Sequence, residues 1–339
     1  MNTVIIAGGG LAGLSLGIAL RNRGVPVRLI EASTYPRHRV CGEFVSGVSD
    51  SELRSLGIAD LFRDAQRHRG TSWHEGNREL LRASLPEDAR GLSRYRLDAL
   101  LAERLVELGG ELITGQRFSG GGDGIVFATG RPRRESHWVG LKAHYESLDL
   151  ATDLEIHMGC GAYVGMTRIE NGRVNVCGLF RRTKPVTGGD SREQMLPLAL
   201  EEVAMPAVAV RLRAARVDAA SIKGVNQFFL GWQRRVDEGD VRIGDSASII
   251  PPFTGNGMSM AFQSALLAVD PLLDWAKGTA NWRDAAARIR DGQLKRFASR
   301  LRWSWVLHGL LLTRTSRLFF TWALRKNLLS FETLYRKVR

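Results

Sequence analysis

The chain has 339 residues, a formal net charge of +13 and 44% hydrophobic residues. This length suffices for two domains or one elaborate domain, and the apolar content is ordinary for a soluble protein. Its three cysteines, Cys41, Cys160 and Cys177, show no CxxC spacing, which argues against a disulfide scaffold or a metal site and favours a reducing cytoplasm. The first predicted strand begins at residue 3, so no signal peptide is expected.

The positive charge is concentrated at the C-terminal end. Residues 283–339 hold fourteen Lys and Arg but only three acidic residues, so they carry most of the net charge. The residues before them are nearly neutral, and nucleic-acid binding is therefore not expected of the whole protein. Any anionic partner should meet this segment.

The first predicted elements are a strand, a glycine turn, a helix and a second strand. Residues 3–7 are apolar and β-branched, which is typical of a buried parallel strand. A Gly8-x-Gly10-x-x-Gly13 turn follows, then a helix to residue 20 and a strand over 25–30. This order is typical of a unit that binds a dinucleotide.

Each residue type in this unit has a mechanical reason. Gly8 allows the tight turn, Gly10 lets the backbone approach a pyrophosphate, and Gly13 lets the helix pack on the strand. The helix N-terminus offers free N–H groups to the phosphates. Glu31, at the end of the second strand, is placed to accept hydrogen bonds from a ribose diol.

The remaining pattern alternates between helices and strands. A helix is expected over 50–68, and a hairpin over 73–85 has its turn at 75–77. Later helices are expected over 93–108, 193–205 (interrupted by Pro197) and 259–273. Strands are expected over 111–113, 125–130, 138–144, 153–158, 162–169, 173–180, 222–230 and 241–245.

Four motifs in fixed order resemble those of the class A flavin monooxygenases, the para-hydroxybenzoate hydroxylase type. They are the N-terminal turn with Glu31, Arg94-x-x-Leu97-Asp98, Gly244-Asp245 and Gly255-Asn256-Gly257. With Arg39-Val40-Cys41-Gly42-Glu43 added, residues 1–275 look more like the branch that holds the geranylgeranyl reductases and the flavin-dependent halogenases. The motif that usually reads Asp-Gly is Ala128-Thr129-Gly130-Arg131 here, and the segment 115–130 is too short for the usual strand meander.

The resemblance implies an α/β fold with a Rossmann-like FAD-binding domain. That domain would comprise residues 1–135 and 224–282. An inserted antiparallel β-sheet domain (136–223) would bind the substrate, and residues 283–339 would form a basic, aromatic helical segment.

The resemblance also implies a set of cofactor contacts. The pyrophosphate, adenosine and ribityl parts of FAD would be held by the turn, Glu31, Arg94 and Asp245, and the flavin edge would face the amides at the start of the last helix. The full set is Gly8, Gly10, Ala12, Gly13, Glu31, Ala32, Arg39, Cys41, Gly42, Arg94, Asp245, Pro252, Gly255, Asn256, Gly257 and Met258.

Two interpretations of Cys41-Gly42-Glu43 stay open. In similar reductases this loop lies beside the flavin, so Cys41 and Glu43 are candidate catalytic residues that tune the flavin, donate a proton or anchor the substrate. Alternatively, Cys41 packs, Gly42 turns and Glu43 pairs with Arg37 or Arg39.

The C-terminal segment also has two interpretations. It contains two apolar clusters, 303–312 and 318–324, flanked by Arg and Lys. The longest uncharged run, 303–313, is too short to span a bilayer. The segment is therefore either an interfacial helix on the inner face of an anionic membrane or a cap on the core.

The predicted function is an FAD-dependent oxidoreductase with NAD(P)H as a transient electron donor. A lipophilic substrate, isoprenoid or polyketide-like, would be reduced at a double bond. The alternative is a monooxygenase of secondary metabolism that hydroxylates or epoxidises its substrate. A second alternative is a flavin-binding electron-transfer or assembly partner without its own turnover.

Overall fold

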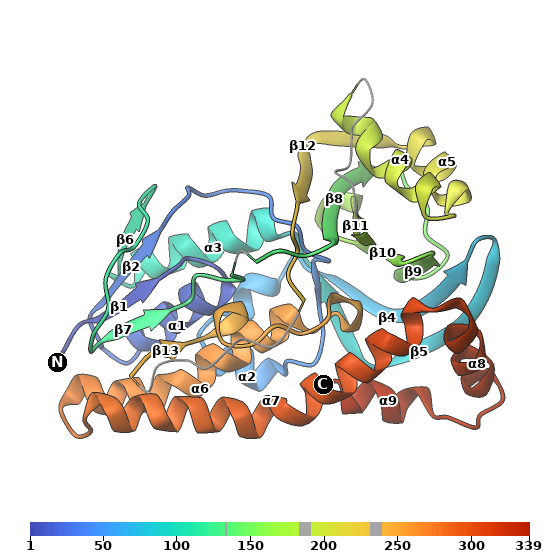
Figure 1. Ribbon diagram of the computed structural model, residues 1–339. Helices are drawn as coiled ribbons and strands as arrows, with labels where there is room; N and C mark the ends of the chain where they lie inside the picture. The colour runs from blue at the N-terminus through green and yellow to red at the C-terminus, as the bar shows by residue number, and fades with distance from the viewer. Residues whose placement is uncertain (133, 183–190, 231–238) are drawn as a thin grey trace.

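The structure, a computed structural model, describes residues 1–132, 134–182, 191–230 and 239–339 (Figure 1). Two sheets organise these residues, and a row of helices that includes the C-terminal segment runs along both of them. The strands of the first sheet come from residues 4–31, 111–127 and 241–242. The nucleotide-binding unit predicted from the sequence is therefore assembled from both ends of the chain.

The first sheet is entirely parallel, as the buried apolar runs predicted. Helices cover one of its faces. Residues 115–124 lead directly back into the sheet without further strands, as the short glycine-rich segment predicted. Its strands in spatial order are β13 (Val241–Arg242), β7 (Ile125–Phe127), β1 (Val4–Ala7), β2 (Val27–Glu31) and β6 (Glu111–Thr114).

The second sheet is larger and recruits strands from two separate parts of the chain. Its hairpin β4–β5 and short β3 come from residues before 135, which were predicted to belong to the nucleotide-binding part. The strands β8 to β12 of the predicted insertion pair with one another only in antiparallel fashion, as expected, and the sheet becomes mixed because β4 pairs with β9 in parallel. The order is β12 (Arg216–Val225), β8 (Trp138–Glu146), β11 (Val174–Arg181), β10 (Ala162–Arg168), β9 (Leu154–Gly159), β4 (Gln66–Glu75), β5 (Arg78–Gly91) and β3 (Phe44–Val45).

The helices fall into three groups around these sheets. The first group packs on the parallel sheet, the second on one face of the mixed sheet, and the third is C-terminal. They are α1 (Leu11–Arg21), α2 (Asp50–Ser55), α3 (Arg94–Glu107) and α6 (Gly257–Lys277); α4 (Met195–Glu202) and α5 (Pro206–Ala214); and α7 (Trp282–Leu312), α8 (Arg314–Arg325) and α9 (Phe331–Lys337). Short 3₁₀ turns lie at Ala59–Phe62, Glu170–Gly172, Arg192–Gln194, Gly244–Ser246 and Pro252–Thr254.

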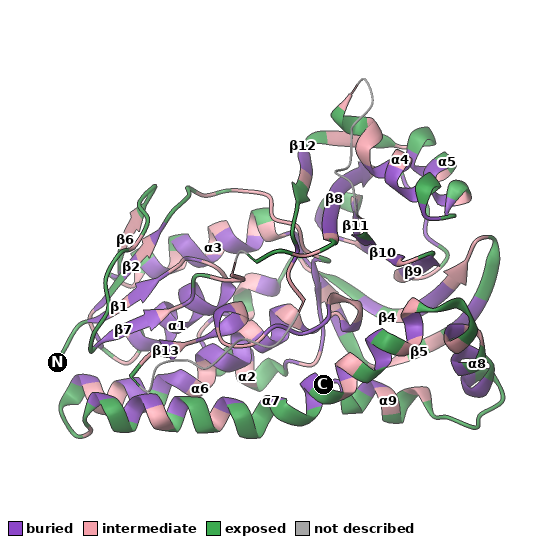
Figure 2. Ribbon diagram, in the orientation of Figure 1, coloured by how far each residue is buried: buried purple, intermediate pink, exposed green. Residues whose placement is uncertain are grey.

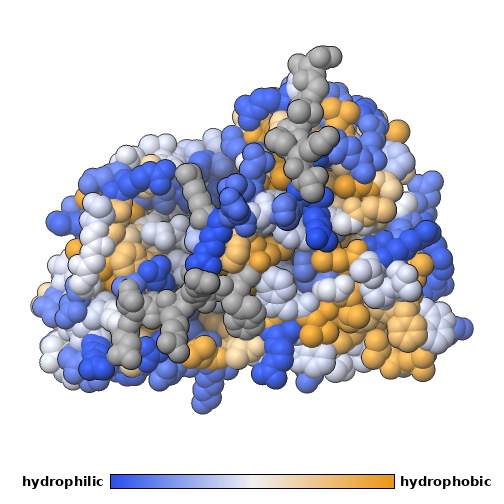
Figure 3. All heavy atoms as spheres, in the orientation of Figure 1, coloured by the Kyte–Doolittle hydropathy of each residue, from blue (hydrophilic) through white to orange (hydrophobic). Residues whose placement is uncertain are grey.

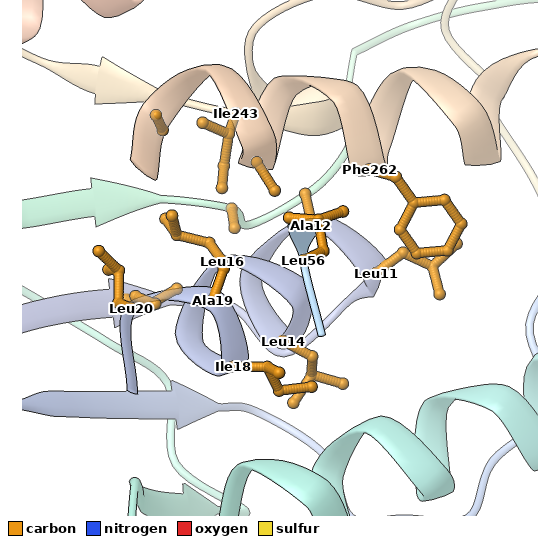
Figure 4. Packing of buried hydrophobic residues seen from close by; sticks show 14 of the residues in the cluster. Leu11, Ala12, Leu14, Leu16, Ile18, Ala19, Leu20, Leu56, Ile243 and Phe262 are labelled. Atoms are coloured by element: carbon orange, nitrogen blue, oxygen red, sulfur yellow. The ribbon is translucent and has the colours of Figure 1, made fainter. Parts of the chain in front are cut away.

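Helix α1 is the centre of the larger core. Its first ten residues are all buried, and a helix that is apolar on every side belongs inside a protein. Figure 4 shows Leu14 and Leu16 spreading from α1, with Ile243 and Phe262 from the C-terminal part of the nucleotide-binding unit close by. This packing fixes the glycine turn, at the start of α1, against α6.

Several predicted elements differ from those observed, and the hairpin expected over 73–85 covers Gln66–Gly91 instead. The helix expected over 50–68 ends at Ser55, because Gly57 takes a left-handed conformation with φ of 75° and the chain then enters β4 at Gln66. The strand expected over 222–230 instead covers Arg216–Val225, since it pairs with β8 from residue 216 onward.

The C-terminal helices connect the two sheets. Helix α7 packs first on α6 and β13, and then reaches the mixed sheet, where α8 and α9 fold back against β5 (Figure 1). Their inner sides are buried and their outer sides exposed (Figure 2). Among the described residues, no helix is long and apolar enough to cross a membrane.

Candidate active site

The glycine turn between β1 and α1 forms a close-fitting cradle. Gly8 has φ of +108°, and a Cβ there would lie 2.4 Å from the carbonyl oxygen of Ala128. A Cβ on Gly13 would lie 2.0 Å from the oxygen of Gly8, so only glycine lets the helix approach the turn this closely. Gly10, by contrast, faces open space with no atom within 4 Å of its Cβ position. A ligand's phosphates could approach the backbone there.

Glu31 closes this cradle at the end of β2. Its carboxylate accepts hydrogen bonds from the backbone N–H of Gly9 at 2.7 Å and of Ser33 at 2.9 Å, and from Arg37 at 2.7 Å. Burial alone would raise the pKa of Glu31, but Arg37 and the two N–H groups outweigh it and hold the pKa below its ordinary value. Glu31 is therefore an ionised acceptor.

Arg37 supplies unused donors beside Glu31. One of its guanidinium nitrogens bonds Glu31, whereas its Nε and Nη2 atoms are buried and have no hydrogen-bond partner among the described residues. Buried donors without a partner are uncommon in folded proteins. A bound anionic group such as a phosphate would satisfy these two donors.

Arg94 begins α3 and forms a buried ion pair. Its guanidinium binds the carboxylate of Asp98 through two hydrogen bonds of 2.7 Å, and Asp98 has no exposed surface. Arg39 reaches the same carboxylate at 3.3 Å. The two arginines are thus held at the edge of the cavity with one acidic partner between them.

Asp245 and Arg131 face each other across the end of the parallel sheet. Arg131 lies 3.2 Å from Asp245, and its guanidinium stacks on the ring of Phe228 at 3.5 Å from the centroid. Arg131 stands in the motif that lacks the usual Asp-Gly pair. Arg131 therefore follows Gly130 of this motif and lies beside Asp245 at the edge of the cavity.

The start of α6 completes the polar part of the site. The first turn of this helix has no side-chain cap, because Asn256 donates its side-chain amide to the carbonyl oxygen of Val338 instead. Gly257 faces open space, as does Gly42 in the loop opposite. Uncapped N–H groups at a helix N-terminus stabilise negative charge.

A single cavity of about 1070 Å³ joins these elements. Of the residues predicted from the sequence, Gly13, Ala32 and Asn256 do not line it, since Gly13 packs on Gly8 and Asn256 binds Val338. The remaining predicted residues all do: Gly8, Gly10, Ala12, Glu31, Arg39, Cys41, Gly42, Glu43, Arg94, Asp245, Pro252, Gly255, Gly257 and Met258.

The cavity continues into an apolar chamber under the mixed sheet. Alternate residues of β10, namely Tyr163, Gly165 and Thr167, face the chamber, whereas Val164 and Met166 pack in the core with α4 and α5. The opposite wall comes from the C-terminal helices, with Leu307, Phe320 and Phe331 among others. This wall was not predicted as part of the site, because the residues that form it lie about 140 to 170 positions after β10 in the chain.

Glu43 lies at the centre of a buried polar network beside this chamber. Its carboxylate accepts from Lys142 Nζ at 3.1 Å and pairs with His144 Nε2 at 2.7 Å, and all three side chains are fully buried. Burial would raise the pKa of Glu43, but Lys142 and His144 hold it below its ordinary value. The predicted pairing with Arg37 or Arg39 was therefore wrong, because both arginines point to Glu31 and Arg39 also to Asp98.

His38 extends the network toward the surface. Lys142 Nζ lies 3.3 Å from His38 Nδ1, and the His38 ring stacks on Tyr95 at 4.4 Å. Burial and then the charge of Lys142 lower the pKa of His38 to about 4. Lys142 and His144 are two residues apart on β8, so their side chains point to the same face of the sheet. This spacing is the sequence signal that could have found them.

Cys41 is a protonated thiol in this arrangement. Its sulfur accepts the backbone N–H of Glu43 at 3.4 Å, and burial raises its pKa. The side chain can keep or donate a proton but is not poised as a thiolate nucleophile.

Among the described residues, one cluster has the composition of a metal site. His74, Glu155 and His157 bring their ligand atoms within 4.8 Å of one another on β4 and β9. The Glu155 oxygen already accepts from Arg211 at 2.9 Å and pairs with His157 at 2.9 Å. The Glu155 carboxylate therefore already has a cationic partner in Arg211.

Comparison with known proteins agrees with this geometry. Residues 1–137 match the family described as an FAD binding domain. The structure of PqsL from Pseudomonas aeruginosa in complex with 2-aminobenzoylacetate is similar, with a TM-score of 0.74, 17% identity and coverage of 94% of this chain and 99% of that one. The chain has the fold of the FAD-dependent monooxygenases.

Two further similarities come from other proteins. The p-nitrophenol 4-monooxygenase PnpA from Pseudomonas putida has a TM-score of 0.74 at 16% identity, and 99% of each chain is covered. The menaquinone reductase of Mycobacterium tuberculosis is 27% identical over 118 residues, which are 34% of this chain. The chain matches only 29% of the length of that reductase.

The residues present fit FAD. The open backbone at Gly10, Gly42 and Gly257 leaves room for a flat ligand, and Glu31 and Arg37 provide an acceptor and unused donors at one end. The uncapped start of α6 lies at the other end, where negative charge is stabilised.

Proposed function

We propose that this protein is an FAD-dependent monooxygenase that acts on an apolar, aromatic substrate. The observation that carries the proposal is the single cavity, in which a polar cradle suited to FAD opens into the chamber beside Tyr163 and Phe320. Substrate and cofactor would then share one enclosed space. Such an arrangement suits a reaction in which water must be excluded.

The overall reaction has a simple balance. FAD, when bound, supplies the redox chemistry by taking two electrons from NAD(P)H and passing them to oxygen. One atom of O₂ would enter the substrate as a hydroxyl group or an epoxide. The second oxygen atom would be reduced by the two electrons, take up two protons and leave as water.

The residues of the chain would position the reactants. The start of α6 and the backbone at Gly42 would hold the flavin, while the alternating face of β10 would orient the substrate above it. The aromatic rings of Tyr163 and Phe253, which meet edge to face at 5.4 Å, offer a surface on which a planar substrate can stack.

The network of Glu43, Lys142 and His144 would hold the Cys41 loop in place. Glu43 adopts a left-handed backbone conformation with φ of 54°, which is unfavourable for a non-glycine residue. The three hydrogen-bonding partners of its carboxylate, including the N–H of Arg94 at 3.0 Å, stabilise that conformation. The loop is therefore a rigid wall of the site, and Glu43 is a positioning residue.

Reduction of a double bond in a lipophilic quinone or isoprenoid is the second candidate. It is supported by the similarity over 118 residues to menaquinone reductase. In this case bound FAD would supply the hydride chemistry, and the Cys41 thiol is the group of the chain that would provide the proton. The apolar chamber suits both candidates.

Oxygen uptake distinguishes the two. Purified protein should be mixed with NADPH or NADH and a panel of phenols, quinones and prenyl lipids, with and without oxygen. Monooxygenation predicts substrate-dependent oxygen uptake and one oxygen-18 atom in the product from labelled O₂. Product formed without oxygen supports the reductase instead. A flavin that no donor reduces would support a binding protein without turnover and contradict both candidates.

A further inference from the structure

We propose that the outer face of α8 and the turn after it bind an anionic lipid bilayer. The face consists of Phe319, Trp322, Leu328 and Leu329, called here the α8 apolar face. Their exposed fractions are 68%, 48%, 64% and 40%. Large apolar side chains gathered in one place on a surface mark an interaction site.

The α8 apolar face is continuous. Phe319 and Trp322 are one helical turn apart, and their ring centroids lie 5.7 Å from each other. Figure 3 shows hydrophobic residues gathered at the lower right of the molecule, where Figure 1 places α8 and α9. A Trp and a Phe on one side of a short helix are typical of insertion at the level of lipid head groups.

Cations flank this face. Arg325 and Lys326 are exposed at the end of α8, and Arg314 is exposed at its start, 3.7 Å from Glu75. Residues 313–339 contain one acidic residue, Glu332, and it pairs with Arg336 at 2.7 Å. An apolar strip surrounded by positive charge is complementary to a bilayer that contains anionic lipids. This charge complementarity selects a lipid surface as the occupant.

The other side of the same helix lines the cavity. Phe320 and Leu324 are buried, line the cavity and belong to the apolar cluster that includes Trp73 and Ile156. Helix α8 is therefore a wall between the chamber and the surface proposed to meet the bilayer. A lipophilic substrate could pass from lipid to chamber by a small movement of this helix. That step rests on the proposed function, but the binding of the bilayer does not.

The experiment measures partition of the full-length protein onto vesicles by co-sedimentation. The vesicles contain either phosphatidylcholine alone or equal parts of phosphatidylglycerol and phosphatidylcholine. We expect strong partition onto the anionic vesicles that weakens as salt is added. The double variant Phe319→Ser/Trp322→Ser should lose at least tenfold in partition. Arg325→Gln/Lys326→Gln should lose about fivefold for each charge removed.

Matched variants show whether the location is right. Val106→Ser/Val210→Ser removes two exposed apolar residues on other helices, α3 and α5, and should partition like the wild type. Trp322→Phe should still bind, but should lose the part of the tryptophan fluorescence that brominated lipids quench in the wild type. Circular dichroism and thermal unfolding verify that each variant is folded.

Several outcomes overturn the proposal. One is equal partition onto both kinds of vesicle, and another is unchanged partition of Phe319→Ser/Trp322→Ser. A third is a dimer of the wild type, seen by analytical ultracentrifugation without lipid, that is absent in the double variant. In this outcome the wild type also does not bind vesicles. That result would assign the α8 apolar face to a second copy of the chain. None of these measurements depends on turnover, so they can fail while the proposed function stands.

Discussion

The carboxylate of Glu43 lies 3.1 Å from the ammonium group of Lys142, and neither side chain has any exposed surface. Opposite charges buried together depend on each other, because either one alone would be strongly disfavoured. The pair joins the Cys41 loop to β8 of the mixed sheet. The pair therefore connects the Cys41 loop, which lines the part of the cavity proposed for FAD, to the sheet that forms the chamber.

Removing one partner of this pair should strongly lower the free energy of unfolding. Glu43→Gln leaves Lys142 buried without a counter-charge, and we expect a loss of about 3–5 kcal/mol in the free energy of unfolding. The double variant Glu43→Gln/Lys142→Met should lose less than the sum of the two single variants. Urea denaturation measures each value. Asp60→Asn, which removes an exposed partner of Arg104, should change stability by less than about 1 kcal/mol. Additive single effects would show that the pair is not coupled.

Glu31 should govern the retention of FAD. Glu31→Gln keeps the shape of the side chain but removes its charge and one acceptor oxygen. A hydrogen bond to a charged group contributes about 1.5–3 kcal/mol, so the dissociation constant for FAD should rise about 10- to 100-fold. Fluorescence titration of apoprotein with FAD measures this. The control is Glu111→Gln, whose exposed pair with Arg28 is remote from the cavity. Equal FAD affinity of Glu31→Gln and the wild type would contradict the assigned role.

The stability of the protein should fall with acidification below neutral pH, in part because of His308. This residue is 4% exposed, and burial lowers its pKa to about 4 from an ordinary value of 6.5. A histidine with a lowered pKa contributes stability above pH 6.5, and the contribution is lost as pH falls toward 4. Between about pH 7.5 and about pH 5 the loss should be on the order of 2 kcal/mol.

His308→Phe isolates this contribution. The residue lies among aromatic rings, with the Trp138 centroid at 5.7 Å and the Trp305 centroid at 5.9 Å, so phenylalanine should fit. Urea denaturation at several pH values should show a smaller decline for the variant than for the wild type. Parallel pH profiles would mean that His308 becomes protonated in the folded protein without cost.

The three cysteines should differ in reactivity. Cys160 is exposed, whereas burial raises the pKa of both Cys41 and Cys177. Since the thiolate is the reactive form, iodoacetamide at neutral pH should modify Cys160 first. Peptide mass spectrometry over time gives the order, and Cys160→Ser should abolish the fast phase. Rapid labelling of Cys41 would instead indicate an activated thiolate.

Gly165 should control the size of the chamber. A Cβ at this position meets only the carbonyl oxygen of Cys177, at 4.0 Å, so Gly165→Leu projects into the chamber without a backbone clash. We expect unchanged FAD binding but a KM for the apolar substrate raised at least tenfold. The control Gly70→Ala lies on β4 and does not line the cavity. An unchanged KM would place the substrate elsewhere.

The nucleotide-binding unit could be predicted from the sequence because its determinants are local. Gly8, Gly13 and Glu31 occur within one βαβ unit, and the periodicity around them fixes the strands and the helix. The positions of β8 to β11 in the mixed sheet followed in the same way from short apolar runs. In these cases the local sequence pattern is sufficient to predict the element.

The partners of Glu43 could not be predicted, because Lys142 lies 99 residues away in the chain. The same holds for the chamber wall from α7 to α9, where Phe320 belongs to one cluster with Trp73 and Ile156, both more than 150 residues earlier in the chain. Apolar residues on these helices fit a core and a membrane surface equally well by sequence. Only the fold shows that Phe320 faces the chamber and Phe319 faces outward.

The most direct test of this account is to identify and count the cofactor in the purified full-length protein. Heat release followed by mass spectrometry should yield FAD, close to one molecule per chain, and the intact protein should show the absorption spectrum of a bound flavin. Reconstitution with added FAD should restore any lost fraction. A protein that contains no flavin and does not bind added FAD would contradict the assignment of the cavity and the function proposed from it.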